Sequence, residues 1–208
     1  MKKINIKLMI ALIGGSLIMA SCGNNSKSEN DSLQNEVGME HDHSSHELGA
    51  TEENRNVSAN IGEMKGDLSV VLKDYFTINE NLVEDDASSA AEASAKLVTS
   101  LKGFKGSKLS DDEQKEVNDI LETAIENAEH ISKNAGEIGH QREHLISLST
   151  DIKDLIAIIG TSQKLYEDFC PMANNNKGAI WISNKEAISN PYMGTKMPTC
   201  GKVQNVIN

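Results

Sequence analysis

The sequence has no excess of basic residues and no recognisable catalytic motif. Its 208 residues contain 20 Lys and Arg against 31 Asp and Glu, a formal net charge of −11. Because nucleic-acid binding relies on a basic patch, this balance argues against a nucleic-acid partner. A glycine-rich phosphate loop, a His-Glu-x-x-His helix and a nucleophile with a spaced base are also missing, so we do not expect an enzyme. With 38% hydrophobic and only 3% aromatic residues, the chain can build one modest core.

The chain also lacks an apolar run of the roughly 20 residues that a membrane-spanning helix requires. The run from Leu8 to Met19 is shorter and follows lysines at positions 2, 3 and 7, the pattern of an export signal. It ends in Leu17-Ile18-Met19-Ala20-Ser21-Cys22, which resembles the lipobox of bacterial lipoproteins. The resemblance implies a signal peptide at residues 1–21 and a lipid anchor on Cys22, which would hold the protein in the cell envelope, facing the periplasm or the cell surface. The alternative is an ordinary signal peptide with a chance cysteine.

Residues 22–66 are rich in Asn, Ser, Glu, Asp and Gly and contain almost no large apolar side chains. Such a composition cannot offset the entropy of ordering, so we predict a disordered tether. Three of the six histidines, His41, His43 and His46, lie within it. They either collect a borderline metal ion such as Cu(II), Zn(II) or Ni(II), or have no role.

The remaining residues, 67–208, contain four segments in which apolar residues recur at helical spacing, at about 68–83, 86–103, 110–131 and 139–160. Ser110 followed by Glu113 is a capping-box signature at the start of the third segment. The connections are short and polar or contain glycine, which favours antiparallel neighbours. We therefore predict an all-α fold, an antiparallel up-down four-helix bundle with a loop-rich C-terminal tail. Two short strands are expected in the tail, around Tyr166–Cys170 and Ala179–Ser183, where they could form a β-hairpin.

Two of the three cysteines, Cys170 and Cys200, lie in this tail and allow two interpretations. An oxidising periplasm would permit a disulfide between them, which would stabilise the fold by about 3.5 kcal/mol. Alternatively, they bind Cu(I) together with the thioether ligands Met172 and Met197, because soft sulfur ligands select this ion.

Several ordered motifs in the chain resemble a helical domain of unknown function. This domain occurs in small exported proteins and at the C-terminus of membrane-fusion adaptors of heavy-metal efflux pumps. The motifs are Tyr75-Phe76, His140-Gln141-Arg142-Glu143-His144, Leu148-Ser149, Cys170-Pro171-Met172-Ala173, Gly178-Ala179-Ile180-Trp181, Asn190-Pro191-Tyr192 and Met197 with Cys200-Gly201. The resemblance implies metal handling, with copper as the expected cargo and an efflux adaptor as a candidate partner. Met193, where the family more often has an aromatic residue, is a further soft ligand or a core replacement.

His140 and His144 are four residues apart on the fourth predicted helix, so their rings share a face and could bind one ion. The alternative for His144 is a half-buried, hydrogen-bonded side chain. Arg142 is expected to clamp an acidic side chain or backbone carbonyls of the tail. Trp181 is expected to cover the open end of the bundle with Ile180 and Tyr192.

Together these features predict an envelope lipoprotein that binds copper for buffering, resistance or hand-over to an efflux system. The expected ion is Cu(I), with zinc as the alternative. Its expected ligands are Cys170, Met172, Met197 and Cys200, with Met193 and His144 in reserve and His41, His43, His46 and His140 as a secondary set. The competing interpretation is a metal-free interaction module, stapled by a disulfide, that docks onto another envelope protein.

Overall fold

The computed structural model describes residues 64–208. The predicted signal peptide at residues 1–21, the lipidation site Cys22 and the tether histidines His41, His43 and His46 lie outside the described residues. Within the described part, no helix combines the length and the apolar character needed to cross a membrane.

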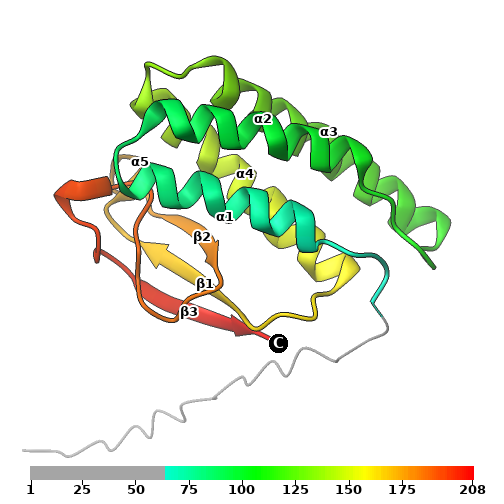
Figure 1. Cartoon of the computed structure of the whole chain (residues 1–208). Coiled ribbons are helices and arrows are strands. Elements are labelled where there is room, and N and C mark those ends of the chain that lie inside the picture. The colour runs from blue at the N-terminus through cyan, green and yellow to red at the C-terminus, as the bar shows by residue number, and fades with distance from the viewer. Residues whose placement is uncertain (1–63) are drawn as a thin grey trace, which may run out of the picture. The chain divides into compact units, whose positions relative to one another are not determined.

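Four helices form the larger part of the fold: α1 (Ser69–Val83), α2 (Ala87–Gly103), α3 (Asp111–Lys133) and α4 (Ile138–Ile159). Consecutive helices lie side by side and run in opposite directions (Figure 1). Their apolar stripes face one another and form a single core. The predicted up-down four-helix bundle is therefore confirmed.

Local signals in the sequence set the helix ends. The Asp86 carboxylate accepts a hydrogen bond of 2.9 Å from the Ser89 N–H at the start of α2, and Ser110 and Glu113 form the predicted capping box of α3. The residue after α4 is Gly160, with a φ of +86°, a conformation that glycine adopts without a Cβ clash.

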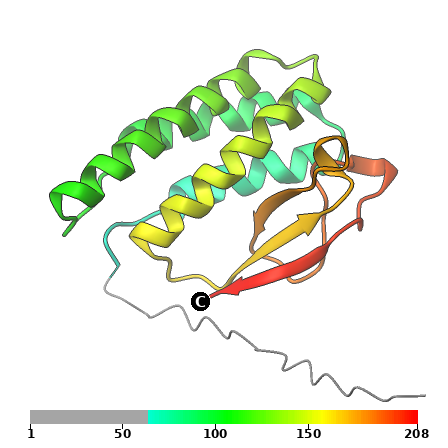
Figure 2. The same ribbon diagram turned by 180° about the vertical axis from the view of Figure 1, so that it is seen from behind.

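A small antiparallel sheet follows the bundle and consists of β1 (Leu165–Cys170), β2 (Ala179–Ser183) and β3 (Lys202–Ile207), in the order β2-β1-β3 (Figure 2). β1 and β2 form the predicted hairpin, joined through the short α5 (Ala173–Asn176). β3 was expected to be loop. It is mostly exposed, with only Val203 and Ile207 half-buried, so its sequence carries little of the apolar alternation that marks a strand.

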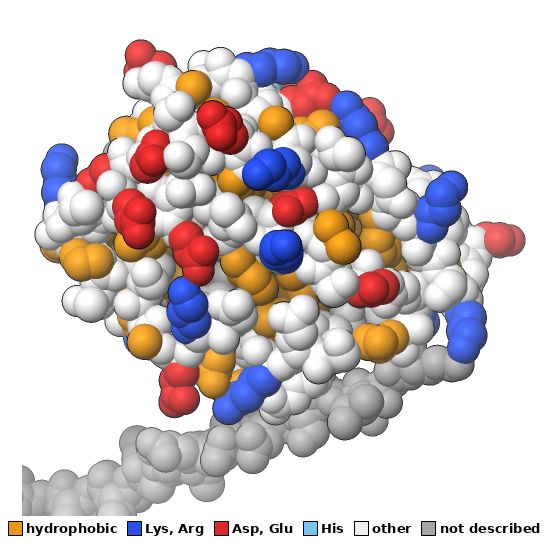
Figure 3. Space-filling model, in the orientation of Figure 1, with side chains coloured by type: hydrophobic (Ala, Val, Ile, Leu, Met, Phe, Trp, Pro, Cys, Tyr) orange, Lys and Arg blue, Asp and Glu red, His pale blue; other side chains and the backbone are white. Residues whose placement is uncertain are grey.

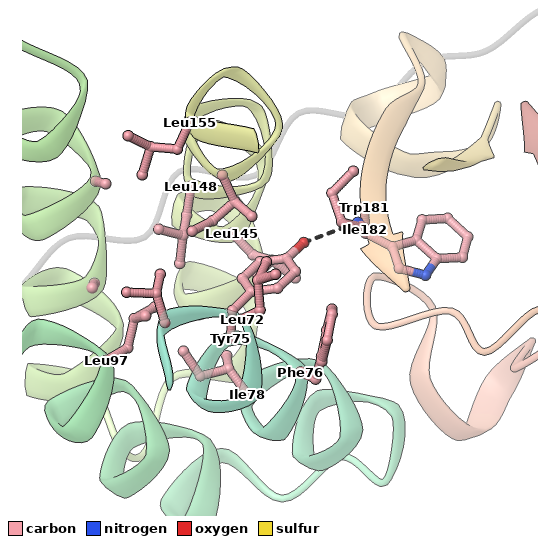
Figure 4. Close-up of a cluster of buried hydrophobic side chains, with 14 of the residues drawn as sticks. Leu72, Tyr75, Phe76, Ile78, Leu97, Leu145, Leu148, Leu155, Trp181 and Ile182 are labelled. Carbon is pink, nitrogen blue, oxygen red and sulfur yellow. Dashed lines mark hydrogen bonds between the residues drawn. The ribbon is translucent and has the colours of Figure 1, made fainter. Parts of the chain in front are cut away.

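The sheet packs against α1 and α4 through buried hydroxyl groups. The Tyr75 hydroxyl of α1 accepts a hydrogen bond of 3.2 Å from the Ile182 N–H of β2 and shares one of 2.8 Å with Ser149 Oγ of α4 (Figure 4). The Tyr192 hydroxyl donates to the Ile180 carbonyl at 2.5 Å. Trp181 is 1% exposed, and its ring meets that of Tyr192 edge-on with centroids 6.0 Å apart. Trp181 and Tyr192 therefore pack together in the tail, and Tyr192 also contacts the bundle, because its hydroxyl lies 3.2 Å from Ser149 Oγ of α4.

Arg142 of α4 ties the tail to the turn between α1 and α2. Its Nε donates to the Pro191 carbonyl at 2.7 Å, and its Nη2 donates to the Leu82 carbonyl at 2.6 Å and to Asp85 Oδ1 at 2.5 Å. The predicted clamp on an acidic side chain and on a tail carbonyl is confirmed.

Charged side chains of both signs are interspersed over the face shown in Figure 3. Surface pairs such as Lys102 with Glu129, at 2.8 Å, each contribute little to stability because water and salt screen them.

Candidate metal centre

Three histidines gather where α3 and α4 meet. His130 lies in the last turn of α3, and His140 and His144 lie in the first turns of α4. One potential ligand atom from each residue lies within 4.8 Å of the other two. The helices run antiparallel across a short connection (Figure 2), which places the end of one beside the start of the other. This group could hold a metal ion.

The three imidazole rings contact one another. The rings of His130 and His144 stack with centroids 4.2 Å apart, and the rings of His140 and His144 meet edge-on at 4.6 Å. Two nitrogens that bind the same tetrahedral ion at about 2.0–2.1 Å are roughly 3.4 Å apart. Rotation of the side chains can close the remaining gap, because His130 and His140 are exposed. The rings are therefore close enough to share an ion only after such a rotation, because His130 and His144 are stacked in nearly parallel planes.

Hydrogen bonds leave a ligand nitrogen free on two of the rings. His144 Nδ1 lies 3.0 Å from Asn127 Oδ1, and His140 Nδ1 lies 3.2 Å from Glu143 Oε2. Both partners are acceptors in this arrangement, since Asn127 uses its Nδ2 to donate to the Thr123 carbonyl at 3.0 Å. Each Nδ1 therefore carries the hydrogen, and the lone pair of Nε2 is available. Partners of this kind orient metal-binding histidines and select their tautomer.

The electrostatic environment favours the neutral form of His144. Burial lowers the pKa of His144 below its usual value, and the neighbouring imidazoles of His130 and His140 lower it further. Carboxylates of Glu143 and Glu126 act in the opposite direction but are weaker influences. Because a proton competes with a metal ion for the same nitrogen, a lowered pKa keeps the ligand available at lower pH.

His130 was missing from the predicted ligand set, although His140 and His144 were in it. The four-residue spacing of the latter pair is visible within a single helix, whereas His130 joins them only across the α3–α4 connection. The sequence does contain a signal for His130. Residues about equally far from the turn between two antiparallel helices face each other, and His130 lies about as far before the α3–α4 connection as His140 lies after it.

The structure brings two members of the predicted sulfur set, Cys170 and Cys200, together. Their Sγ atoms are 3.3 Å apart, and both cysteines are free thiols. Met172 and Met197 are 46% and 38% exposed. Met193 is partly buried and packs against the core, as expected for a core replacement.

Comparison with known proteins concerns the helical part of the chain. Residues 71–164 match the family model described as Protein of unknown function (DUF3347). The match agrees with the resemblance to a domain of unknown function over these residues, which include all three histidines of the cluster and end before β1. No curated protein and no solved structure matches the chain, so no named relative connects it with efflux adaptors.

Proposed function

We propose that this protein is an envelope lipoprotein that binds a borderline metal ion, copper first and zinc second, through His130, His140 and His144. The observation that carries the proposal is the convergence of three imidazoles, with one ligand atom from each within 4.8 Å of the others. Imidazole nitrogens suit copper, zinc and nickel, and divalent copper binds most tightly to a given set of nitrogen ligands. The ligand type therefore favours Cu(II) over the Cu(I) that the sulfur set alone would select.

The exposure of the cluster supports a role in buffering or hand-over rather than permanent storage. His130 and His140 are exposed and His144 is half-buried, so one side of a bound ion would remain open to water or to an acceptor. Three protein ligands also leave a coordination position unfilled. Such a site can release its ion to an efflux system, and the lipid anchor on Cys22 would place it at the membrane.

Calorimetric titration with Cu(II) and Zn(II) tests the proposal. The parent for the experiment is the full chain with His41→Ala, His43→Ala and His46→Ala, which removes the tether histidines from the result. We expect one equivalent of Cu(II) to bind, more tightly than Zn(II). Adding His130→Ala, His140→Ala and His144→Ala should weaken Cu(II) binding by about 100-fold or more, because all three nitrogens are lost.

The control is Asn118→Ala, which changes an exposed residue of α3 several turns from the cluster. It should bind Cu(II) like the parent. Equal affinity in the parent and the triple-histidine variant would overturn the proposal and favour the metal-free interaction module.

The hydrogen bond to His144 provides a finer test of the same site. Asn127→Ala removes the acceptor of His144 Nδ1–H and should lower Cu(II) affinity about tenfold, the usual effect of losing such a partner. Asn127→Asp keeps an acceptor oxygen and should retain most of the affinity. If both variants bind equally well, Asn127 does not orient the ligand.

A further inference from the structure

We propose that Cys170 and Cys200 form a reversible disulfide that fixes the C-terminal strand β3 to the sheet. The proposal concerns different residues from the histidine cluster and does not depend on metal binding. It rests on the position of the two thiols at the junction of β1 and β3 and on the weak packing of β3.

Separate backbone contacts position each of the two cysteines. Cys170 is the last residue of β1, where it is held by pairing with Ala179 of β2. Cys200 is held separately, because its N–H donates to the Met197 carbonyl at 3.2 Å and its carbonyl accepts from Asn190 Nδ2 at 2.5 Å. The 3.3 Å between the Sγ atoms is a contact distance, so forming the bond requires only a small movement of the side chains.

The residue after Cys200 shows how closely the chain approaches β1 at this point. Gly201 has a φ of +139°, and a Cβ there would lie 2.9 Å from the Phe169 carbonyl oxygen and 3.0 Å from Trp181 Cη2. Only glycine allows this approach. The backbone is therefore shaped to bring Cys200 against the end of β1.

The ligands around the pair favour a disulfide over a metal ion. Within residues 64–208, the histidine cluster is the only group of three or more His, Cys, Asp or Glu residues placed to share an ion. Among these residues the two thiols therefore have no third His, Cys, Asp or Glu ligand beside them. A disulfide needs only the two cysteines.

The disulfide would stabilise the position of β3, which packs only weakly against the rest of the protein. β3 lies at the edge of the sheet beside β1, and four of its six residues are exposed. Its attachment depends mainly on the backbone hydrogen bonds to β1, which can open locally at an edge. A covalent link two residues before β3 begins would restrict that opening.

The chemistry is an exchange with a small-molecule or protein disulfide. The more exposed Cys200, as the thiolate, attacks one sulfur of that disulfide, whose S–S bond breaks as a mixed disulfide forms. Cys170, as the thiolate, then attacks Cys200 Sγ and releases the second sulfur. The two protons lost by the cysteines end on the two released thiols, so the cysteines are oxidised and the incoming disulfide is reduced.

The test uses the full chain with Cys22→Ser, so that Cys170 and Cys200 are the only thiols. After equilibration with oxidised glutathione we expect the intact mass to fall by about 2 Da, the two hydrogen atoms lost, with no glutathione adduct. The oxidised form should melt about 10 °C above the dithiothreitol-reduced form. Cys170→Ser with Cys200→Ser, which keeps the side chains nearly the same size, should melt at the same temperature in both conditions.

Hydrogen exchange of the amides in β3 tests the role of the bond. Reduction should lower their protection at least tenfold while the amides of α3 are unchanged. A product that carries only glutathione adducts would overturn the disulfide, and equal protection of β3 in both forms would overturn its role in fixing the strand.

Discussion

Replacing Asp168 by asparagine is expected to raise the free energy of unfolding at pH 8 by about 4 kcal/mol. Asp168 lies in β1 and is completely buried, and neither of its carboxylate oxygens has a hydrogen-bond partner within the described structure. Burial raises the pKa of this carboxyl group to about 7. A charged, unpaired carboxylate inside the protein is strongly disfavoured. Ionisation of Asp168 above this pH therefore destabilises the folded protein.

The sign of the pH dependence follows from the two states of the chain. In the unfolded chain Asp168 loses its proton near the ordinary aspartate pKa of 3.8, whereas in the folded protein it keeps the proton to about pH 7. The folded state therefore binds more protons between these values, and stability falls as the pH rises from about 4 to about 7. Asp168→Asn mimics the protonated form and should remove this decline.

Urea denaturation of the parent and of Asp168→Asn between pH 4 and pH 8 measures the effect. The two stabilities should be close at pH 4 and diverge up to pH 7. The pKa is lowered to about 2 in Asp85, Glu113 and Glu129. The stability that these carboxylates contribute is lost mainly as the pH falls below about 4, and the loss is the same in both proteins. Parallel curves from pH 4 to 8 would show that Asp168 stays ionised with a normal pKa.

The adjacent residue provides the matched control. Glu167 is 2% exposed, but its carboxylate accepts a hydrogen bond of 2.8 Å from Lys153 Nζ of α4. A register shift between Glu167 and Asp168 interrupts the regular pairing of β1 with β3, and both acidic side chains are buried there. Glu167→Gln should lower stability at pH 7 by about 1–3 kcal/mol, because it breaks a partnered charge. The two neighbouring substitutions are thus expected to act in opposite directions.

Arg142→Ala is expected to lower the free energy of unfolding by about 2–4 kcal/mol, because two buried backbone carbonyls lose a charged donor. Its side chain is only 17% exposed and binds three acceptors from two different segments. Removing it leaves the carbonyls of the buried Pro191 and Leu82 without their charged donor, and each unsatisfied buried group adds to the loss. Asp85 is exposed and keeps Thr195 as a partner, so its share of the loss is small. Chemical denaturation of the folded chain at pH 7 measures the change.

A conservative variant separates the guanidinium geometry from its charge. Arg142→Lys keeps a positive charge but cannot reach the Pro191 and Leu82 carbonyls and Asp85 at once, because an ammonium lacks the planar fork. It should recover less than half of the lost stability. Full recovery would show that only the charge opposite Asp85 matters, and no loss in Arg142→Ala would show that the clamp does not hold the tail.

The helices and the hairpin could be predicted because their signals are local. The capping box of Ser110 and Glu113 marks a helix start, and Gly160 marks a helix end, whatever else the chain does. The short apolar run in Ala179–Ser183, bounded by Gly178 and polar residues, likewise indicates a strand. The role of Arg142 could also be predicted, because a long cationic side chain between buried positions of α4 needs hydrogen-bond acceptors nearby.

The histidine cluster and the third strand could not be predicted in the same way. His130 is an ordinary polar residue at the end of α3 until the bundle places it against His140 and His144. β3 has little apolar patterning of its own, and it becomes a strand because β1 offers unpaired backbone groups at its edge. Similarly, the spacing of Cys170 and Cys200 does not fix their distance in space, which the fold sets at 3.3 Å between the Sγ atoms.

The sequence by itself therefore determined the four helices, the β1–β2 hairpin and the types of metal-binding residue, because hydrophobic periodicity and capping act over a few residues. Only the tertiary structure decided that His130 completes a three-imidazole cluster, that Cys170 meets Cys200, and that Asp168 is buried without a partner. These outcomes depend on how elements dock and on the register between strands, which join residues far apart in the chain. Docking is set by the whole core at once, so no single segment of the sequence records it.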